Sequence, residues 1–222
     1  VNRYVKKVTI GEKNEKGLSV RVDWVLSDIQ VPYMMEYLIR DNGTIIVTGS
    51  IDLTGTKLPE LPRFGMRMEL HQPYENLTYY GRGPLENYID RYSSSFIGRY
   101  ENKVENQFYW YIRPQETGNK TDVRWLTLLD SEGQGVRITG LQPVAFSALH
   151  FSPEDLDPGL TRKLQHTIDI VPQKNIFLHV DLRQRGLGGD NSWGMYPHNE
   201  YRLLDKKYTY SYMIELVEKG SD

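Results

Sequence analysis

Trp193 ends a short run of glycine and small polar residues, and it is the side chain here best suited to ligand contact. Glycine adopts backbone angles that other residues resist, and Asp, Asn and Ser side chains bond nearby backbone, so the run predicts a turn. A flat ring on such a loop can stack on the apolar face of a sugar. The alternative is that Trp193 folds back as a lid on the core. The residues expected to shape the loop are Gly188, Gly189, Asp190, Asn191 and Ser192.

Carboxylates could supply a second kind of chemistry, because paired Asp and Glu residues hydrolyse glycosidic bonds. Nothing in the spacing of the candidates marks one as an acid and another as a nucleophile. We therefore expect ordinary ion pairs, with Asp90 paired to Arg91 or Arg99. Glu116 should cap a turn. The candidates, all in loop-like and aromatic-rich segments, are Glu86, Asp90, Glu116 and Asp122.

The histidines stand at no metal-ligand spacing such as HxH or HExxH, and the chain has no cysteine. A GxSxG elbow, a P-loop and a GxGxxG run are also absent. His179 alternates with Leu178 and Val180, so it should lie on the less apolar face of a strand. These residues predict neither a metal site nor a catalytic residue in this chain. The histidines are His71, His150, His166, His179 and His198.

The composition is that of a globular protein, with 25% charged and 39% hydrophobic residues among 222. The net charge of -2 and the lack of a basic block argue against a nucleic-acid partner. No run of about 18 apolar residues occurs, so we expect no membrane span. The absence of cysteine does not decide between bacterial cytoplasm and periplasm. Residues 1–5 contain neither an initiating Met nor a signal-peptide pattern, and we expect a piece of a longer chain.

Hydrophobic and polar residues alternate along much of the chain, which is the period of a β-strand with one buried face. With many short strands and no alternating helices, the expected fold is an all-β antiparallel sandwich. Asp41-Asn42-Gly43 and residues 131–135 predict hairpin turns. The clearest alternating runs cover residues 18–26, 64–70, 176–182 and 208–216.

Helix signals are few. Ser152 is a candidate N-cap for a short helix, and residues 84–91 could carry one helical turn. Residues 81–106 otherwise read as a long irregular stretch, and loops of that length are often functional.

Aromatic residues gather in the middle third of the chain and are interleaved with arginines. Such mixtures build sugar-binding grooves and protein interfaces, where rigid rings and arginine forks are favoured. They also build aromatic cores covered by the aliphatic stems of arginines. The composition leaves both interpretations open.

Three motifs, in order, resemble the C-terminal domain of the large bacterial β-galactosidases of glycoside hydrolase family 2. Residues 80–91 (YGRGPLENYIDR) resemble its G-x-G-P-x-E-N-Y-x-D-R motif, and residues 113–125 (RPQETGNKTDVRW) are similar to its next block. Residues 188–193 (GGDNSW) look like its G-G-D-[DN]-S-W loop. The resemblance implies an antiparallel supersandwich similar in fold to the galactose mutarotases. Residues 1–222 would form one such domain at the C-terminal end of a multidomain glycosidase, without some of its N-terminal strands.

The resemblance also implies a function for the parent enzyme, which is retaining hydrolysis of terminal β-galactosides such as lactose. Its two catalytic glutamates, with magnesium and sodium ligands, would lie in a barrel domain that precedes this one in the same chain. No catalytic residue and no cofactor are therefore expected within these 222 residues. What carries over is Trp193, whose counterpart stacks on the aglycone sugar. Gly188 and Gly189 would shape its loop, and Asp190 and Asn191 would brace it.

Two alternatives remain. A stand-alone carbohydrate-binding module would use the same loop without any barrel. A mutarotase-like epimerase would need a histidine acid and a glutamate base around one pyranose ring, and the Asn-His motif expected for it is missing. The sequence leaves open whether the parent enzyme is a homo-oligomer.

Overall fold

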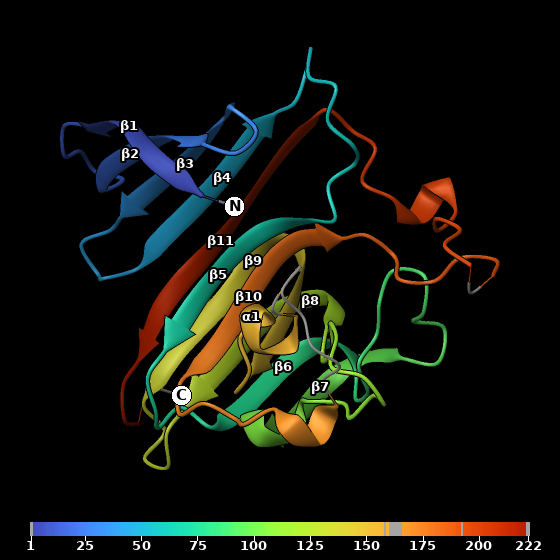
Figure 1. Cartoon of the computed structure of the whole chain (residues 1–222). Helices are drawn as coiled ribbons and strands as arrows, with labels where there is room; N and C mark the ends of the chain where they lie inside the picture. The colour runs from blue at the N-terminus through green and yellow to red at the C-terminus, as the bar shows by residue number, and fades with distance from the viewer. Residues whose placement is uncertain (1, 158, 160–165, 192, 221–222) are drawn as a thin grey trace.

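The chain folds into strands joined by hairpin turns and several longer connections, with very little helix (Figure 1). The computed structural model describes residues 2–157, 159, 166–191 and 193–220. The short helical segments are η1 (Val104–Asn106), α1 (Pro153–Leu156), η3 (Thr167–Asp169) and η4 (Asn199–Tyr201). The strands are β1 (Arg3–Ile10), β2 (Leu18–Leu26), β3 (Val31–Ile39), β4 (Ile45–Asp52), β5 (Arg63–Leu70), β6 (Asn76–Gly83), β7 (Phe96–Lys103), β8 (Lys120–Leu129), β9 (Gly135–Leu149), β10 (Ile176–Gln184) and β11 (Lys207–Val217).

The strand pairs are antiparallel and follow the order β1-β2-β3-β4-β11-β9-β8-β6-β7, with β10 joining β9 to β5. β9 pairs with β8 along one edge and changes partner along the other, where residues 135–140 pair with β11 and residues 145–149 pair with β10. This change of partner folds the sheet over on itself. Buried side chains from β3, β4, β5, β6, β8, β9, β10 and β11 then meet in one core cluster. The prediction of an all-β antiparallel fold is confirmed, and the arrangement is that of a β-sandwich.

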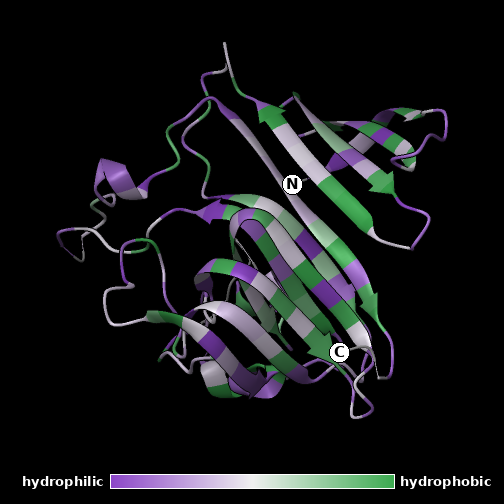
Figure 2. Cartoon of the chain, turned by 180° about the vertical axis from the view of Figure 1, so that it is seen from behind, coloured by the Kyte–Doolittle hydropathy of each residue, from purple (hydrophilic) through white to green (hydrophobic). Residues whose placement is uncertain are grey.

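The alternating pattern accounts for most strands, and Figure 2 shows apolar and polar positions following one another along them. β2, β5, β10 and β11 coincide with the four predicted runs, with ends that differ by a residue or two. Both hairpin turns form. Asn42 Oδ1 accepts the Thr44 N–H at 3.1 Å, and Asp130 Oδ1 accepts the N–H groups of Glu132 and Gln134 at 2.8 and 2.9 Å.

The prediction of a long irregular stretch over residues 81–106 is wrong. β6 continues to Gly83, and β7 occupies Phe96–Lys103 as its antiparallel neighbour. β7 ends the order of paired strands and is exposed at most of its positions. A strand with no buried face needs no alternation of apolar residues, so the pattern gave no signal for it.

The two helix predictions had different outcomes. α1 begins where expected, with the Ser152 hydroxyl accepting the Asp155 N–H at 3.1 Å and the Asp155 carboxylate accepting the Ser152 N–H at 2.7 Å. Residues 84–91 form bends and turns closed by a bridge between Tyr88 and Arg91, and no helical turn.

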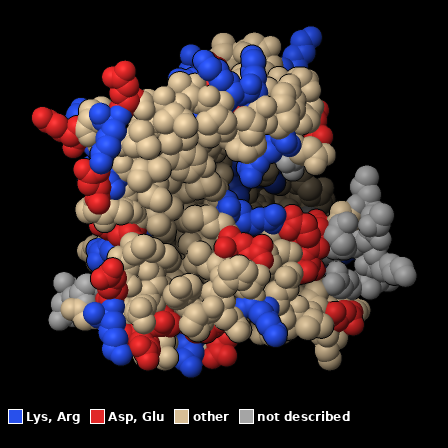
Figure 3. All heavy atoms as spheres, turned by 90° about the vertical axis from the view of Figure 1, so that its left-hand side faces the viewer, with Lys and Arg blue, Asp and Glu red and all other residues tan. Residues whose placement is uncertain are grey.

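The aromatic residues of the middle third divide between core and surface. Tyr79, Tyr88 and Phe108 are buried, whereas Tyr109 and Trp110 are exposed. Both interpretations of this cluster therefore hold for part of it. On the face drawn in Figure 3, basic side chains predominate in the upper right half, and basic and acidic side chains meet beside a hollow at the centre. None of the helices in the described part of the chain has the length and apolar character that a bilayer-spanning helix needs.

Candidate functional site: the Trp193 loop and its anchors

The Trp193 side chain lies in the segment between β10 and β11 and points away from the core. It is 92% exposed, which excludes the alternative of a lid on the core. Figure 1 shows this orange segment beside the green connection from β6 to β7, far from it in sequence. A large indole left in water by the fold is available for contact with another molecule.

The loop around Trp193 is held largely by its own polar groups. Asn191 Oδ1 accepts the Trp193 N–H at 2.8 Å, and Asp190 Oδ1 lies 2.7 Å from His198 Nε2. A side chain on Gly189 would clash with the Met195 carbonyl oxygen, so this position requires glycine. The shaping and bracing roles expected of the loop residues stay predictions. Ser192 lies outside the described residues.

Asp90 anchors the loop from the neighbouring connection. Its Oδ2 accepts the Gly188 N–H at 2.7 Å, and a Cβ on Gly186 would lie 2.7 Å from the same carboxylate. The expected pairing of Asp90 with Arg91 or Arg99 is therefore wrong. The two arginines have other partners, since Arg91 Nη2 donates to Glu86 Oε1 at 2.7 Å and Arg99 pairs with Glu101 at 2.5 Å.

Glu60 forms a second anchor, which the sequence did not reveal. Its Oε1 accepts a hydrogen bond from Arg185 at 3.0 Å, and its Oε2 accepts one from Arg202 at 2.6 Å. Both guanidinium groups lie over the Tyr196 ring, at 5.6 and 4.9 Å from its centroid. The two arms of the long β10–β11 connection are thereby tied together. Glu60 is separated from both arginines by more than a hundred residues, and no local pattern marks it.

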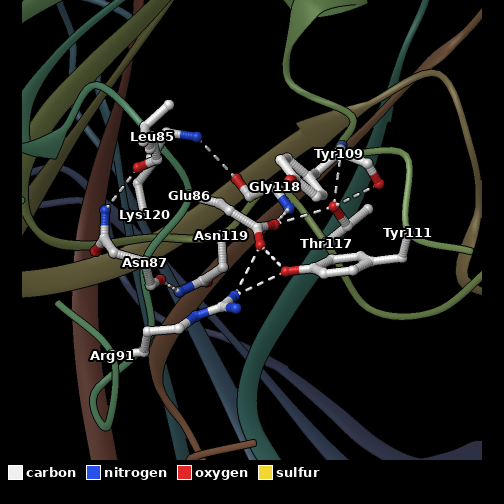
Figure 4. Close-up of polar contacts among 10 residues, drawn as sticks. All are labelled: Leu85, Glu86, Asn87, Arg91, Tyr109, Tyr111, Thr117, Gly118, Asn119 and Lys120. Atoms are coloured by element: carbon white, nitrogen blue, oxygen red, sulfur yellow. Dashed lines mark hydrogen bonds and ion pairs between the residues drawn. The ribbon is translucent and has the colours of Figure 1, made fainter.

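Glu86, the first of the candidate carboxylates, is fully engaged in a structural cluster (Figure 4). Its Oε1 accepts from Arg91 and from the Tyr111 hydroxyl. Its Oε2 accepts from the Thr117 hydroxyl at 3.0 Å and the Gly118 N–H at 2.7 Å. A carboxylate with four donors ties the 80–91 motif to the 113–119 block. It is not arranged as a free acid or nucleophile.

The residue that follows Glu86 joins the same two motifs from within the interior. Asn87 Oδ1 accepts the Thr121 N–H at 2.9 Å and its hydroxyl at 2.6 Å, and Asn119 Nδ2 donates to the Asn87 carbonyl at 2.8 Å. Beside them lies Lys120, whose Nζ donates to Gln107 Oε1 at 3.0 Å and the Gly118 carbonyl at 3.2 Å. Burial lowers the pKa of Lys120 to about 8. The motifs thus serve to fix the loops from which Asp90 projects.

Glu116 belongs to a third cluster, centred on Arg63, and does not serve as a turn cap. Arg63 Nη2 lies 2.8 Å from Glu116 Oε2 and Nε lies 3.1 Å from Asp181 Oδ2. Nη1 contacts His179 Nδ1 at 2.6 Å. Burial raises the pKa of Glu116 and raises that of Asp181 to about 7. The last candidate, Asp122, pairs with Arg82 at 2.5 Å, so every candidate carboxylate has a structural partner.

The contact with Arg63 defines the state of His179. A guanidinium can only donate, so Nδ1 accepts and the proton of the neutral ring sits on Nε2. Burial and the charge of Arg63 lower the pKa of His179 to about 3. Its folded pKa is below its unfolded value, so its contribution to stability is present above about pH 6.5 and is lost as the pH falls toward 3.

We expect the His179 ring to stay neutral from pH 5 to 8 in an NMR titration of the chain. His198 is the internal control, because its hydrogen bond to Asp190 raises its pKa above the ordinary value. The ring-carbon shifts of His198 should move in this range with a midpoint above pH 6.5, and those of His179 should not. A His179 titration near pH 6.5 would show that the Arg63 contact does not form.

Metal ligation finds no support in the part of the chain that the structure describes. No group of three or more His, Asp or Glu side chains is placed to hold an ion there. The two acidic groups around Arg63, Glu116 and Asp181, share its single guanidinium.

Known proteins similar to this chain agree with the three motifs. Residues 2–214 match the family described as β-galactosidase small chain. A β-galactosidase of Priestia megaterium is 32% identical over 97% of this chain, and one of Streptococcus thermophilus is 34% identical over 94% of it. In both cases the aligned part is 20% of the relative, so the chain spans about a fifth of the length of the curated relatives it matches.

The fold is an all-β antiparallel sandwich that carries an exposed tryptophan on an anchored loop. The chain belongs to the β-galactosidase small-chain family.

Proposed function

We propose that this chain is the part of a β-galactosidase that completes the aglycone side of the active site with Trp193. The observation that carries the proposal is the 92% exposed indole on a loop that two separate anchors hold in place. The catalytic glutamates of retaining hydrolysis, with the magnesium and sodium implied by the resemblance, would belong to a barrel domain of the same parent chain. That barrel is the partner on which this domain would pack.

In this function the chain binds and orients substrate and leaves bond cleavage to the barrel. The Trp193 ring stacks on the apolar face of the leaving sugar, such as the glucose unit of lactose, and excludes water from it. The direct test is Trp193→Ala in the complete enzyme, with lactose compared against an aryl galactoside. A larger effect on lactose supports the proposal, and equal effects on both count against it.

The isolated chain should not hydrolyse β-galactosides, because each candidate carboxylate is tied to a structural partner. The measurement is release of a chromophore from an aryl β-galactoside by the purified chain. The control is the same preparation of Trp193→Ala, which should be equally inactive. Turnover that is absent from a mock purification would contradict the accessory role. Binding of galactosides without turnover would favour the carbohydrate-binding module instead.

The epimerase alternative is less well supported by the geometry. His179 and Glu116 do come together, but both contact the guanidinium of Arg63. The depressed pKa of His179 keeps its ring neutral, so near neutral pH no imidazolium is present to act as a general acid.

A further inference from the structure

The Trp193 loop is tied to the β6–β7 connection by a hydrogen bond whose acceptor comes from a distant motif. The side-chain hydrogen bonds of Asp190 and Asn191 in the described part of the loop stay within residues 190–198. The Gly188 N–H instead donates to Asp90, which is 98 residues away in the sequence. The position of the loop relative to the sandwich therefore depends on where Asp90 lies.

The backbone of the β10–β11 connection passes close to the Asp90 carboxylate at the point where Gly188 contacts it. A Cβ at Gly186 would lie 2.7 Å from Asp90 Cγ, so only a glycine lets the chain pass this close. Asp90 Oδ1 is buried and has no hydrogen-bond partner among the described residues. Burying an unpaired carboxylate oxygen is unfavourable for folding, and such groups in native structures call for a reason other than stability.

The base of the connection does not depend on Asp90. Glu60 holds Arg185 and Arg202, and the Gly186 N–H donates to the Tyr201 carbonyl at 2.8 Å. If the bond to Gly188 were removed, these contacts would still tie the two arms together. What would be released is the Gly188 side of the tip that carries Trp193, while Tyr196 on the other side would still lie under the two arginines.

We propose that Asp90 is a positioning residue that sets the place of Trp193 and with it the selectivity for the aglycone. The inference rests on the proposed function of Trp193. A released loop samples more conformations, and a ligand that stacks on Trp193 must then order it, which weakens binding. An aryl galactoside, with its good leaving group, depends less on that stacking. Loss of the anchor should therefore raise KM for lactose roughly five- to twentyfold and change aryl-galactoside hydrolysis little.

The experiment uses the complete parent enzyme with Asp90→Ala, Trp193→Ala and the double variant. Asp90→Asn keeps an oxygen that can accept the Gly188 N–H, so it should recover most of the lactose KM. The matched control is Asp130→Ala, which removes an aspartate that accepts two backbone N–H groups in a hairpin outside the Trp193 connection. It should leave the ratio of lactose to aryl-galactoside KM unchanged.

The double-variant cycle separates the possible outcomes, because residues that act through one contact are not additive. The proposal expects Asp90→Ala to add little once Trp193 is gone. The proposal is overturned if the effects of Asp90→Ala and Trp193→Ala on the lactose KM multiply in the double variant. It is also overturned if Asp130→Ala raises the lactose KM as Asp90→Ala does. A third contradicting result is a lactose KM that Asp90→Ala leaves unchanged while Trp193→Ala raises it. If Trp193→Ala itself leaves lactose binding intact, the proposed function fails and this inference fails with it.

Discussion

In the complete parent enzyme, Trp193→Ala should weaken lactose binding roughly ten- to a hundredfold. This corresponds to the loss of about 1–3 kcal/mol of stacking, by analogy with aromatic stacking on nucleic-acid bases. In the proposed function Trp193 contacts the leaving sugar, so the loss should appear mainly in KM for lactose and in the affinity for glucose-like acceptors. The chemical step with an aryl galactoside should suffer less. Steady-state kinetics on both substrates provide the measurement.

The same substitution should leave the stability of the chain nearly unchanged, since a side chain that is 92% exposed leaves no cavity behind. Trp110→Ala is a suitable control. Trp110 is also exposed, at 62%, but its ring packs edge-on against Phe108 at 4.8 Å. It should lower stability without a lactose-specific effect. Small, equal kinetic effects of Trp193→Ala on both substrates, with a large loss of stability, would show that Trp193 is a structural residue.

The second large effect should come from Arg63→Met, which should lower the free energy of unfolding by roughly 3–5 kcal/mol. Arg63 is the counter-ion of Asp181, whose side chain is 1% exposed, and of Glu116. Without it, two carboxylates lose their compensating charge in the interior. Urea unfolding of the chain at pH 7 measures the change.

The pH dependence of this loss has a definite sign. The folded pKa of Asp181, raised to about 7, is above its unfolded value, so its contribution to stability is present below about pH 4 and is lost as the pH rises to 7. Removing Arg63 takes away the one influence that lowers this pKa. The loss should then continue above pH 7, and the deficit of Arg63→Met should be larger at pH 8.5 than at pH 6.

Arg67→Met is the matched control for Arg63→Met. Arg67 lies on the same strand, but it is 43% exposed and pairs with the exposed Glu154 at 2.6 Å. Exposed ion pairs contribute about 0–1 kcal/mol, so this variant should be nearly as stable as the parent chain. Equal losses for the two variants would mean that the Arg63 cluster is not the buried network described here.

The candidate site could be recognised from sequence as far as Trp193 and its loop, but not as far as its anchors. Glycines and small polar residues around a lone tryptophan are a local pattern, and they predicted an exposed turn correctly. The predicted pairing of Asp90 with a nearby arginine was wrong, and so was the prediction that Glu116 caps a turn, because their partners, Gly188 and Arg63, are distant in the sequence. Glu60 was missed altogether, because its two arginine partners are more than a hundred residues away in the sequence.

The sequence by itself determined the strand content, the hairpins and the family, because the period of a strand and the residues of a turn are properties of a few neighbouring positions. Tertiary structure alone decided that β7 exists, since an exposed edge strand needs no alternation and is defined by pairing with β6. It also decided that Asp90 meets Gly188. That contact joins the β6–β7 and β10–β11 connections, and only the order of strands in the folded sheet brings them to the same side of the molecule.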